Sequence, residues 1–292
     1  MTATDENSPG ISSNRAGTGQ KMSHTRGRGS AVDYSEGYSL LRDTGEIARF
    51  LPSVFRSLPL AMKYPTEILR QTGILIIGSS FIILWMEGLI AAEISLEAHY
   101  VLKQLGATSY VGVFSSYCDY ACGQHVMWGW VLGAKVGCGL VAEIGSMRIS
   151  EEIDAVKVMG LNAMGYIVGT RIMAIMIVTP FLYFVATGVM YVTNYIVNVI
   201  IFQSVSPGGY LSFHFQFATI QDIFTGMFLA VLIGFFIAVS ATYYGYNSTG
   251  GAVGVGKNTA KSEVMALIIT GVVGVLAGLL FFTGFETGPI AK

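Results

Sequence analysis

A dense group of charged side chains stands in the short segment 143–160, which reads EIGSMRISEEIDAVKVMG. Its acidic residues Glu151, Glu152 and Asp154 could form ion pairs with a basic partner. The chain holds no nucleophile–base motif, zinc-protease signature or nucleotide fingerprint. We therefore expect this segment to bind another molecule, and we expect no enzymatic activity of the chain itself.

The spacing within this segment predicts a short amphipathic helix. Ser150 is a favourable N-cap, Glu151 and Glu152 complement the helix dipole, and Gly160 ends the helix. The apolar residues fall on one side: Ile149, Ile153, Val156 and Met159. Physical reasoning alone leaves two interpretations open, a capped interfacial loop and a lever that enters a cytoplasmic partner.

Two other patterns look like ligand sites but have simpler explanations. The run from Gly251 to Asn258 nearly matches a phosphate-binding loop, yet Asn258 stands where magnesium needs a hydroxyl. Cys118, Cys122 and His125 share one helical face without a suitable fourth ligand, so ordinary packing is favoured over zinc. We expect no metal and no cofactor.

Other residues within hydrophobic stretches carry structural or functional signals. Glu87 is ionisable in a span, which by default marks a functional position, and we expect it to face an internal cavity. Glycines at intervals of four predict close helix packing: Gly129, Gly133, Gly137, Gly274 and Gly278.

A membrane-embedded bundle must position these residues. Of the 292 residues, 52% are hydrophobic and only 12% charged, with a mean hydropathy of +0.58, which excludes most soluble classes. The net charge of −1 gives no field that would favour nucleic acid. Segments long enough to cross a bilayer lie at about 70–92, 120–144, 165–203, 217–241 and 262–284. The fold class is therefore an all-α polytopic membrane protein with five spans. Six is the alternative if the long third segment, which contains Pro180, includes a re-entrant piece.

The ends and loops of the chain indicate its orientation. Residues 1–45 are rich in Ser, Thr, Gly and Arg with almost no large apolar side chains, and they are expected to form a disordered cytoplasmic tail. Residues 46–63 are expected to form an amphipathic helix at the membrane surface, although Pro52 and Pro59 interrupt its regularity. Basic residues cluster before the first span, in the loop 145–164 and in the loop 242–261, whereas the opposite loops, 93–119 and 204–216, hold only Lys103. The positive-inside rule places the N-terminus in the cytoplasm and the C-terminus outside.

Three stretches resemble a known family. Residues 142–160 resemble the signature of the MlaE/YrbE permeases, which are membrane subunits of lipid-transporting ABC systems. Residues 244–256 are similar to that family's glycine-rich cytoplasmic loop, and 106–112 to YrbE permeases encoded with Mce (mammalian cell entry) proteins in actinobacteria. The chain departs from the family pattern where Ala163 follows Asn162 and where Ala252 replaces a proline. The loop residues that match are Tyr246, Gly250, Gly251, Gly254 and Gly256.

The resemblance implies an MlaE-like permease domain over residues 46–292 in the plasma (inner) membrane. It implies a cytoplasmic ABC ATPase dimer that hydrolyses ATP, a second, paralogous YrbE permease, Mce-type substrate-binding proteins outside, and lipid import. In this interpretation the acidic residues meet basic groups on the ATPase, while Ile153 and Val156 fill an apolar slot in it. The implied coupling residues are Glu143, Arg148, Ser150, Glu151, Glu152, Ile153, Asp154, Val156, Met159 and Gly160. A non-transporting scaffold or receptor that binds a partner through loop 145–164 is the alternative, and an ATP-independent channel is a third.

Overall fold

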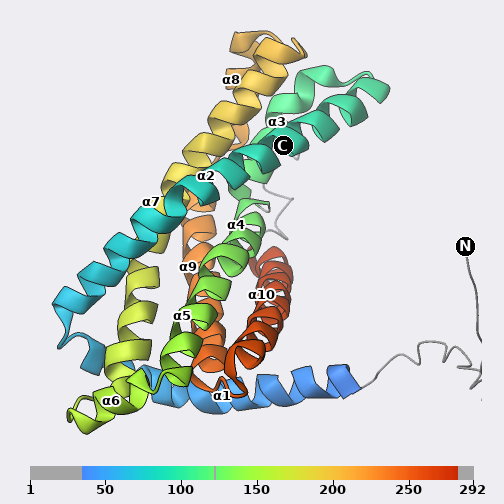
Figure 1. Ribbon diagram of the computed structural model, residues 1–292. Coiled ribbons are helices and arrows are strands. Elements are labelled where there is room, and N and C mark those ends of the chain that lie inside the picture. Colours follow the sequence, from blue (N-terminus) through green and yellow to red (C-terminus); the bar gives the residue numbers. More distant parts are fainter. Residues whose placement is uncertain (1–34, 122, 282–292) are drawn as a thin grey trace, which may run out of the picture.

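The computed structural model describes residues 35–121 and 123–281, and these residues form a helical bundle without strands (Figure 1). The expectations for the tail before residue 35, for Cys122 and for the chain beyond residue 281 lie outside the described residues. Within the described part, an all-α architecture is confirmed.

Five helical segments of the described chain are long and apolar enough to cross a membrane, which confirms the prediction of five rather than six. The first, fourth and fifth are single helices: α2 (Pro65–Gln104), α9 (Ile220–Tyr246) and α10 (Gly251–Phe281). The second joins α4 (Gln124–Leu132) to α5 (Cys138–Ile149) through a π-helical turn, η3 (Gly133–Gly137). The third runs through Pro180 without a break, from η4 (Met164–Gly169) through α7 (Thr170–Tyr195) to η5 (Ile196–Ile201).

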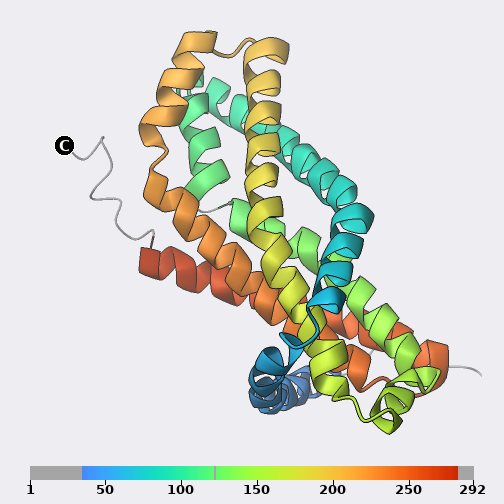
Figure 2. The same cartoon turned by 90° about the vertical axis from the view of Figure 1, so that its left-hand side faces the viewer.

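The helix α1 (Ser35–Ala61) lies across one end of the bundle (Figures 1 and 2). It begins at Ser35, so the last part of the segment expected to lack structure is helical, and it continues through Pro52 and Pro59. Its close approach to η4 needs glycine, since a Cβ added at Gly169 would lie 2.9 Å from that of Ala61. The helix is thus packed on the bundle as well as placed for a membrane surface.

The opposite end of the bundle is also helical, where the sequence predicted loops. α2 meets η1 (Thr108–Tyr110) and α3 (Val111–Ser116), and α3 packs against the π-helical η2 (Tyr117–Ala121) and α8 (Pro207–Phe217). Ser206 starts α8 by accepting a hydrogen bond from the Gly209 amide at 3.2 Å, with Pro207 following it. Local capping thus starts α8 where hydropathy alone gave no span.

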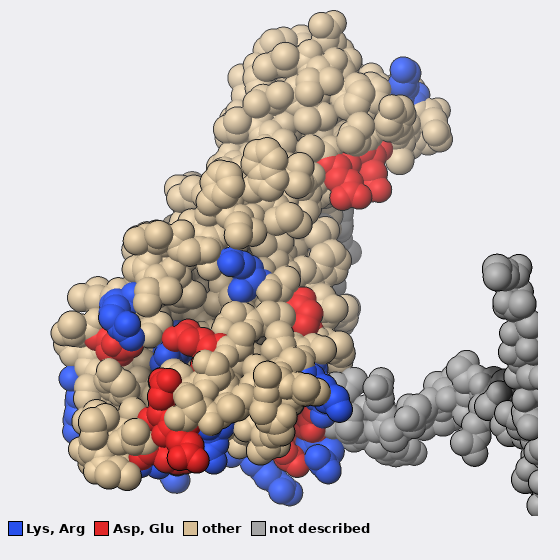
Figure 3. Space-filling view, in the orientation of Figure 1, with Lys and Arg blue, Asp and Glu red and all other residues tan. Residues whose placement is uncertain are grey.

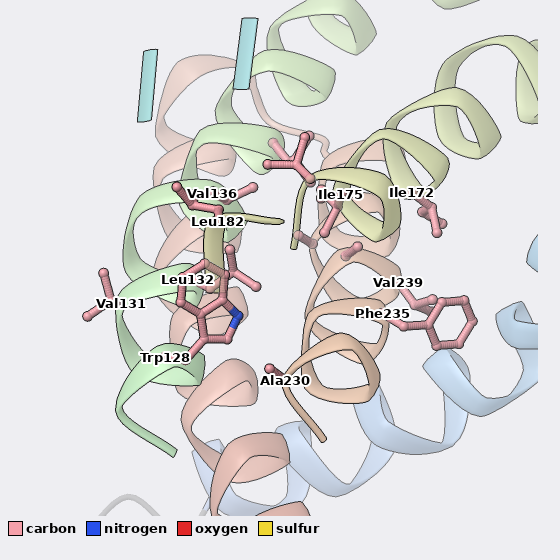
Figure 4. Close-up of a cluster of buried hydrophobic side chains, with 14 of the residues drawn as sticks. Trp128, Val131, Leu132, Val136, Ile172, Ile175, Leu182, Ala230, Phe235 and Val239 are labelled. Atoms are coloured by element: carbon pink, nitrogen blue, oxygen red, sulfur yellow. The ribbon is translucent and has the colours of Figure 1, made fainter. Parts of the chain in front are cut away.

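The main core lies between α4, α7 and α9 (Figure 4). Trp128 is fully buried and packs edge-on against Tyr183, with ring centroids 5.6 Å apart. The glycine stripe brings α4 and η3 against α10: a Cβ at Gly129 would lie 2.5 Å from the Thr270 hydroxyl, and one at Gly133 2.8 Å from Ala266. The packing prediction is confirmed at these positions, whereas a Cβ at Gly278 would meet nothing within 4 Å.

Candidate coupling site at one end of the bundle

The short helix α6 (Glu152–Val158) lies at the same end of the bundle as α1 (Figure 1). Ser150 is not its N-cap: the Ser150 hydroxyl donates to the Ser146 carbonyl at 3.0 Å and lies 2.9 Å from Glu152 Oε1. Glu151 precedes the helix instead, with a positive φ of 61°. The predicted cap is therefore wrong, because Ser150 completes the last turn of α5 and the chain reverses one residue later.

The apolar face of α6 is turned into the protein. Ile153 is fully buried and Val156 is 8% exposed, in a cluster with Ile144 of α5, Ala163 and Ile167 of η4. The expectation that Ile153 and Val156 fill a slot in a partner is wrong. Apolar surface of the chain itself is close enough to cover them, which removes them from water without any partner.

What α6 exposes is its end. Val158 is 88% exposed and Met159 67% exposed, and we call this pair the apolar tip. Glu151 and Glu152 are exposed beside it, and Gly160, with φ of 78°, turns the chain back toward the bundle. Lys, Arg, Asp and Glu side chains gather around this end of the molecule (Figure 3). An apolar tip within a charged surface is typical of a protein contact.

Asp154 is engaged within the chain rather than offered to a partner. Its carboxylate pairs with Lys157 at 2.8 Å and with Arg148 of α5 at 3.2 Å. The Lys157 hydrogen bond, helped by the charges of both cations, lowers the pKa of Asp154. The Lys157 ammonium also lies 5.9 Å from the ring centroid of Tyr246. These contacts fix α6 to the ends of α5 and α9.

An ion pair joins the two spans that flank α6. Arg171 of α7, only 4% exposed, donates to Glu143 of α5 at 2.6 Å and to the Ile167 carbonyl at 2.9 Å. Glu143, predicted as a coupling residue, therefore forms an ion pair with α7, and its side chain remains 44% exposed. Sequence reasoning did not select Arg171 for the site, although a basic residue near the start of the third span was a usable signal.

The expected glycine-rich loop is largely helical. Only residues 247–250 separate α9 from α10, so Gly251, Gly254 and Gly256 belong to the first turns of α10. Gly250 has a φ of 84°, and a Cβ at Gly254 would overlap the Thr249 carbonyl. These glycines serve a tight turn rather than a flexible loop.

The turn between α9 and α10 also packs against α5. A Cβ at Gly145 would lie 2.9 Å from the Val255 side chain, and one at Gly245 would lie 2.9 Å from the Ile144 Cβ. Ile144 also belongs to the cluster that buries α6. α6 thus packs on α5, and α5 in turn packs on α9 and α10.

Glu87, expected to face a cavity, is enclosed in the bundle. It is fully buried on α2, and neither carboxyl oxygen has a hydrogen-bond partner among the described residues. A narrow apolar cavity begins one turn away, at Ile83, and Glu87 is not among the residues that line it. The side chain is therefore placed apart from the coupling site.

Five segments long and apolar enough to cross a membrane, together with the helices α1 and α6 at one end of them, define an all-α polytopic membrane protein. The family model named Permease MlaE matches residues 68–280. The chain belongs to the MlaE permease family.

The names of several relatives point the same way. A probable ABC transporter permease of Rickettsia bellii is 31% identical over 157 residues, covering 54% of this chain and 60% of the relative. One of Synechocystis is 29% identical over 164 residues, covering 55% and 60%. The Arabidopsis thaliana protein named trigalactosyldiacylglycerol 1, chloroplastic, is 26% identical over 154 residues, covering 53% and 44%. The chain thus matches about three-fifths of the length of the bacterial relatives.

Proposed function

We propose that this protein is the permease subunit of an ABC-type lipid transporter and that a separate cytoplasmic ATPase dimer drives it through α6. One observation carries the proposal: α6 exposes an apolar tip and two glutamates at the end of the bundle while its opposite face is packed onto the spans. The family and the names of the bacterial relatives support the ABC permease role.

In the proposed mechanism α6 acts as a lever whose buried face is packed on the spans. The ATPase binds the apolar tip, and its basic groups meet Glu151 and Glu152. Closure of the ATPase dimer on ATP displaces α6, and the buried contact of Ile153 carries that displacement to α5 and η4. Helix packing has discrete arrangements, so the spans change from one packing to another rather than bending continuously. ATP hydrolysis belongs to the partner.

The lipid substrate, the inward direction and the further partners follow from the resemblance. The proposed assembly lies in the inner membrane with α1 and α6 on the cytoplasmic side, as the basic residues at this end favour. A paralogous permease pairs with this chain around a lipid cavity, and Mce-type proteins meet the opposite end. The word trigalactosyldiacylglycerol in the name of the Arabidopsis relative is a lipid name and supports a lipid substrate.

The decisive experiment tests the tip in the native membrane. We expect the full chain to co-purify with an ATPase, and the paired change Val158→Asp and Met159→Asp to abolish that association while leaving the chain folded. Glu97→Lys, an exposed change on α2 at the opposite end of the bundle, is the control. An ATPase that stays bound to the double variant would exclude the lever.

A non-transporting scaffold would use the same tip for another partner. Lipid movement in vesicles separates the two functions: a transporter requires a hydrolysis-competent ATPase, and an ATPase variant that binds ATP without hydrolysing it should stop transport. Transport that continues with this variant would instead indicate a channel or carrier.

A further inference from the structure

The seam between α2 and α7 changes character at Glu87. Toward α1 the seam is mostly apolar: Ser79 and Thr179 also line the narrow cavity there, but its other lining residues include Leu75, Ile83, Ile175, Val178 and Leu182. Away from α1 the buried side chains of the same two spans include five polar ones beside apolar residues such as Ala91 and Met190. The polar ones are Ser95, His99, Thr187, Asn194 and Asn198. One half of the seam therefore excludes water and the other offers hydrogen bonds to it.

A buried hydrogen-bond chain occupies the polar half and ends on a carboxyl group. Asn198 Nδ2 donates to Ser95 Oγ at 2.9 Å, and Ser95 Oγ donates to Asn194 Oδ1 at 2.6 Å. Asn194 Nδ2 then donates to Asp119 Oδ1 at 2.7 Å. The chain joins α2, the third span and the π-helical η2, and each donor points toward Asp119.

Asp119 and Glu87 are the two fully buried carboxyl groups of this region. Asp119 Oδ2 and both oxygens of Glu87 lack a hydrogen-bond donor, and no ion pair of the described residues includes either group. An unpaired carboxylate in such a place is so costly that the group takes up a proton instead.

The titratable side chains on the elements around these carboxyls are Tyr120 of η2, Tyr183 of α7, Tyr210 and His214 of α8, His125 at the start of α4 and His99 of α2. Lys135 of η3, an element that packs against α2, is half-buried and forms no ion pair with either carboxyl. α3 contains no titratable residue, and Asp222 near the start of α9 is half-buried and is held by the capping hydrogen bonds with Thr219. The surroundings therefore favour the neutral form of both acids.

We propose that Glu87 and Asp119 are proton-binding sites whose protons exchange with water through the polar half of the α2–α7 seam. Each carboxylate binds one proton and becomes a neutral acid. Release of the proton regenerates the carboxylate and forms one hydronium ion in the water. At Asp119 the proton resides on Oδ2, because Oδ1 already accepts from Asn194. The proposal goes beyond the permease role and does not require an ATPase partner.

Infrared spectroscopy of the full chain in lipid nanodiscs tests the binding of protons. At neutral pH we expect the carbonyl stretch of protonated carboxylic acids, part of it lost in Glu87→Gln and part in Asp119→Asn. Both variants imitate the neutral acid, so the fold is kept. Glu93→Gln, an exposed position on α2, is the matched control and should leave the band unchanged.

A wild-type protein without this band, or a band that both variants retain, would overturn the proposal. A band lost when sodium chloride replaces choline chloride at constant pH would also overturn it, because Na⁺ would then be the ligand.

The rate of exchange tests the route. On transfer to D₂O the band should shift to lower frequency, and Asn198→Leu, which closes the polar half of the seam, should slow the shift severalfold. Thr179→Val, in the apolar half, should leave the rate unchanged. A band that never shifts, or a rate that Asn198→Leu does not alter, would exclude exchange through the seam. Loss of ATPase binding would disprove the proposed transporter without affecting either result.

Discussion

The ion pair between Glu143 and Arg171 gives the sharpest test of how this end of the bundle is held together. The two partners differ in burial, since the Arg171 side chain is 4% exposed and that of Glu143 is 44% exposed. We predict that Glu143→Gln destabilises the protein more than Arg171→Met, although Arg171→Met removes more hydrogen bonds than Glu143→Gln. The reason is that Glu143→Gln leaves a buried positive charge without its partner, whereas Arg171→Met leaves a negative charge that water can reach.

The magnitude follows from the solvation of the remaining partner. Glu143→Gln leaves a buried guanidinium without its counter-charge, and we expect a loss of about 1.5–3 kcal/mol, the range of hydrogen bonds to charged groups. Arg171→Met leaves a carboxylate that water can reach, and the methionine fills much of the space of the arginine stem, so we expect a loss of about 1 kcal/mol or less.

Thermal unfolding of the full chain in nanodiscs, followed by tryptophan fluorescence, measures the difference. The double variant Glu143→Gln with Arg171→Met should unfold close to the Arg171→Met temperature, because the stranded charge is gone. If Arg171→Met unfolds at the lower temperature, or the two single losses add, the burial argument is wrong.

Three further predictions concern packing and charge. Gly129→Ala should lower the free energy of unfolding by about 1–3 kcal/mol, because its Cβ would enter a side chain of α10, while Gly278→Ala should change it little in a chemical-denaturation comparison. Ile153→Ala should cost about 2–4 kcal/mol by cavity formation, whereas Val158→Ala should leave the stability unchanged and weaken ATPase binding in a pull-down titration. The pKa of Asp154 is lowered in the folded protein, so its ion pairs stabilise α6 above the ordinary aspartate range and are lost as pH falls through the folded pKa. Proteolysis at the α5–α6 turn should therefore accelerate on acidification in the wild type and depend less on pH in Asp154→Asn.

Much of the architecture could be predicted from hydropathy and spacing. The number of spans depends on long apolar runs, and such runs have few alternatives in a membrane because the backbone must satisfy its hydrogen bonds within each helix. The glycine stripe of Gly129 and Gly133 correctly predicted a close helix contact, since only small residues allow it. The resemblance over residues 142–160 led to the family that the comparison confirms.

Positions that depend on distant neighbours could not be predicted. The sequence predicts a partner contact for the apolar face of α6, whereas Ile144 and Ile167 cover Ile153 once the spans assemble. The boundary between α9 and α10 was misplaced because glycines favour loops in an isolated sequence, while here Gly254 allows the tight turn that begins α10.

The sequence by itself determined that this chain is a membrane bundle with a charged helix between its second and third spans, because hydrophobic length and helical spacing are local properties. Only the tertiary structure decided which face of that helix is free, which carboxyl groups are enclosed, and that Arg171 anchors Glu143. Burial is set by residues far apart along the chain, and their approach depends on how five helices pack together rather than on any one of them.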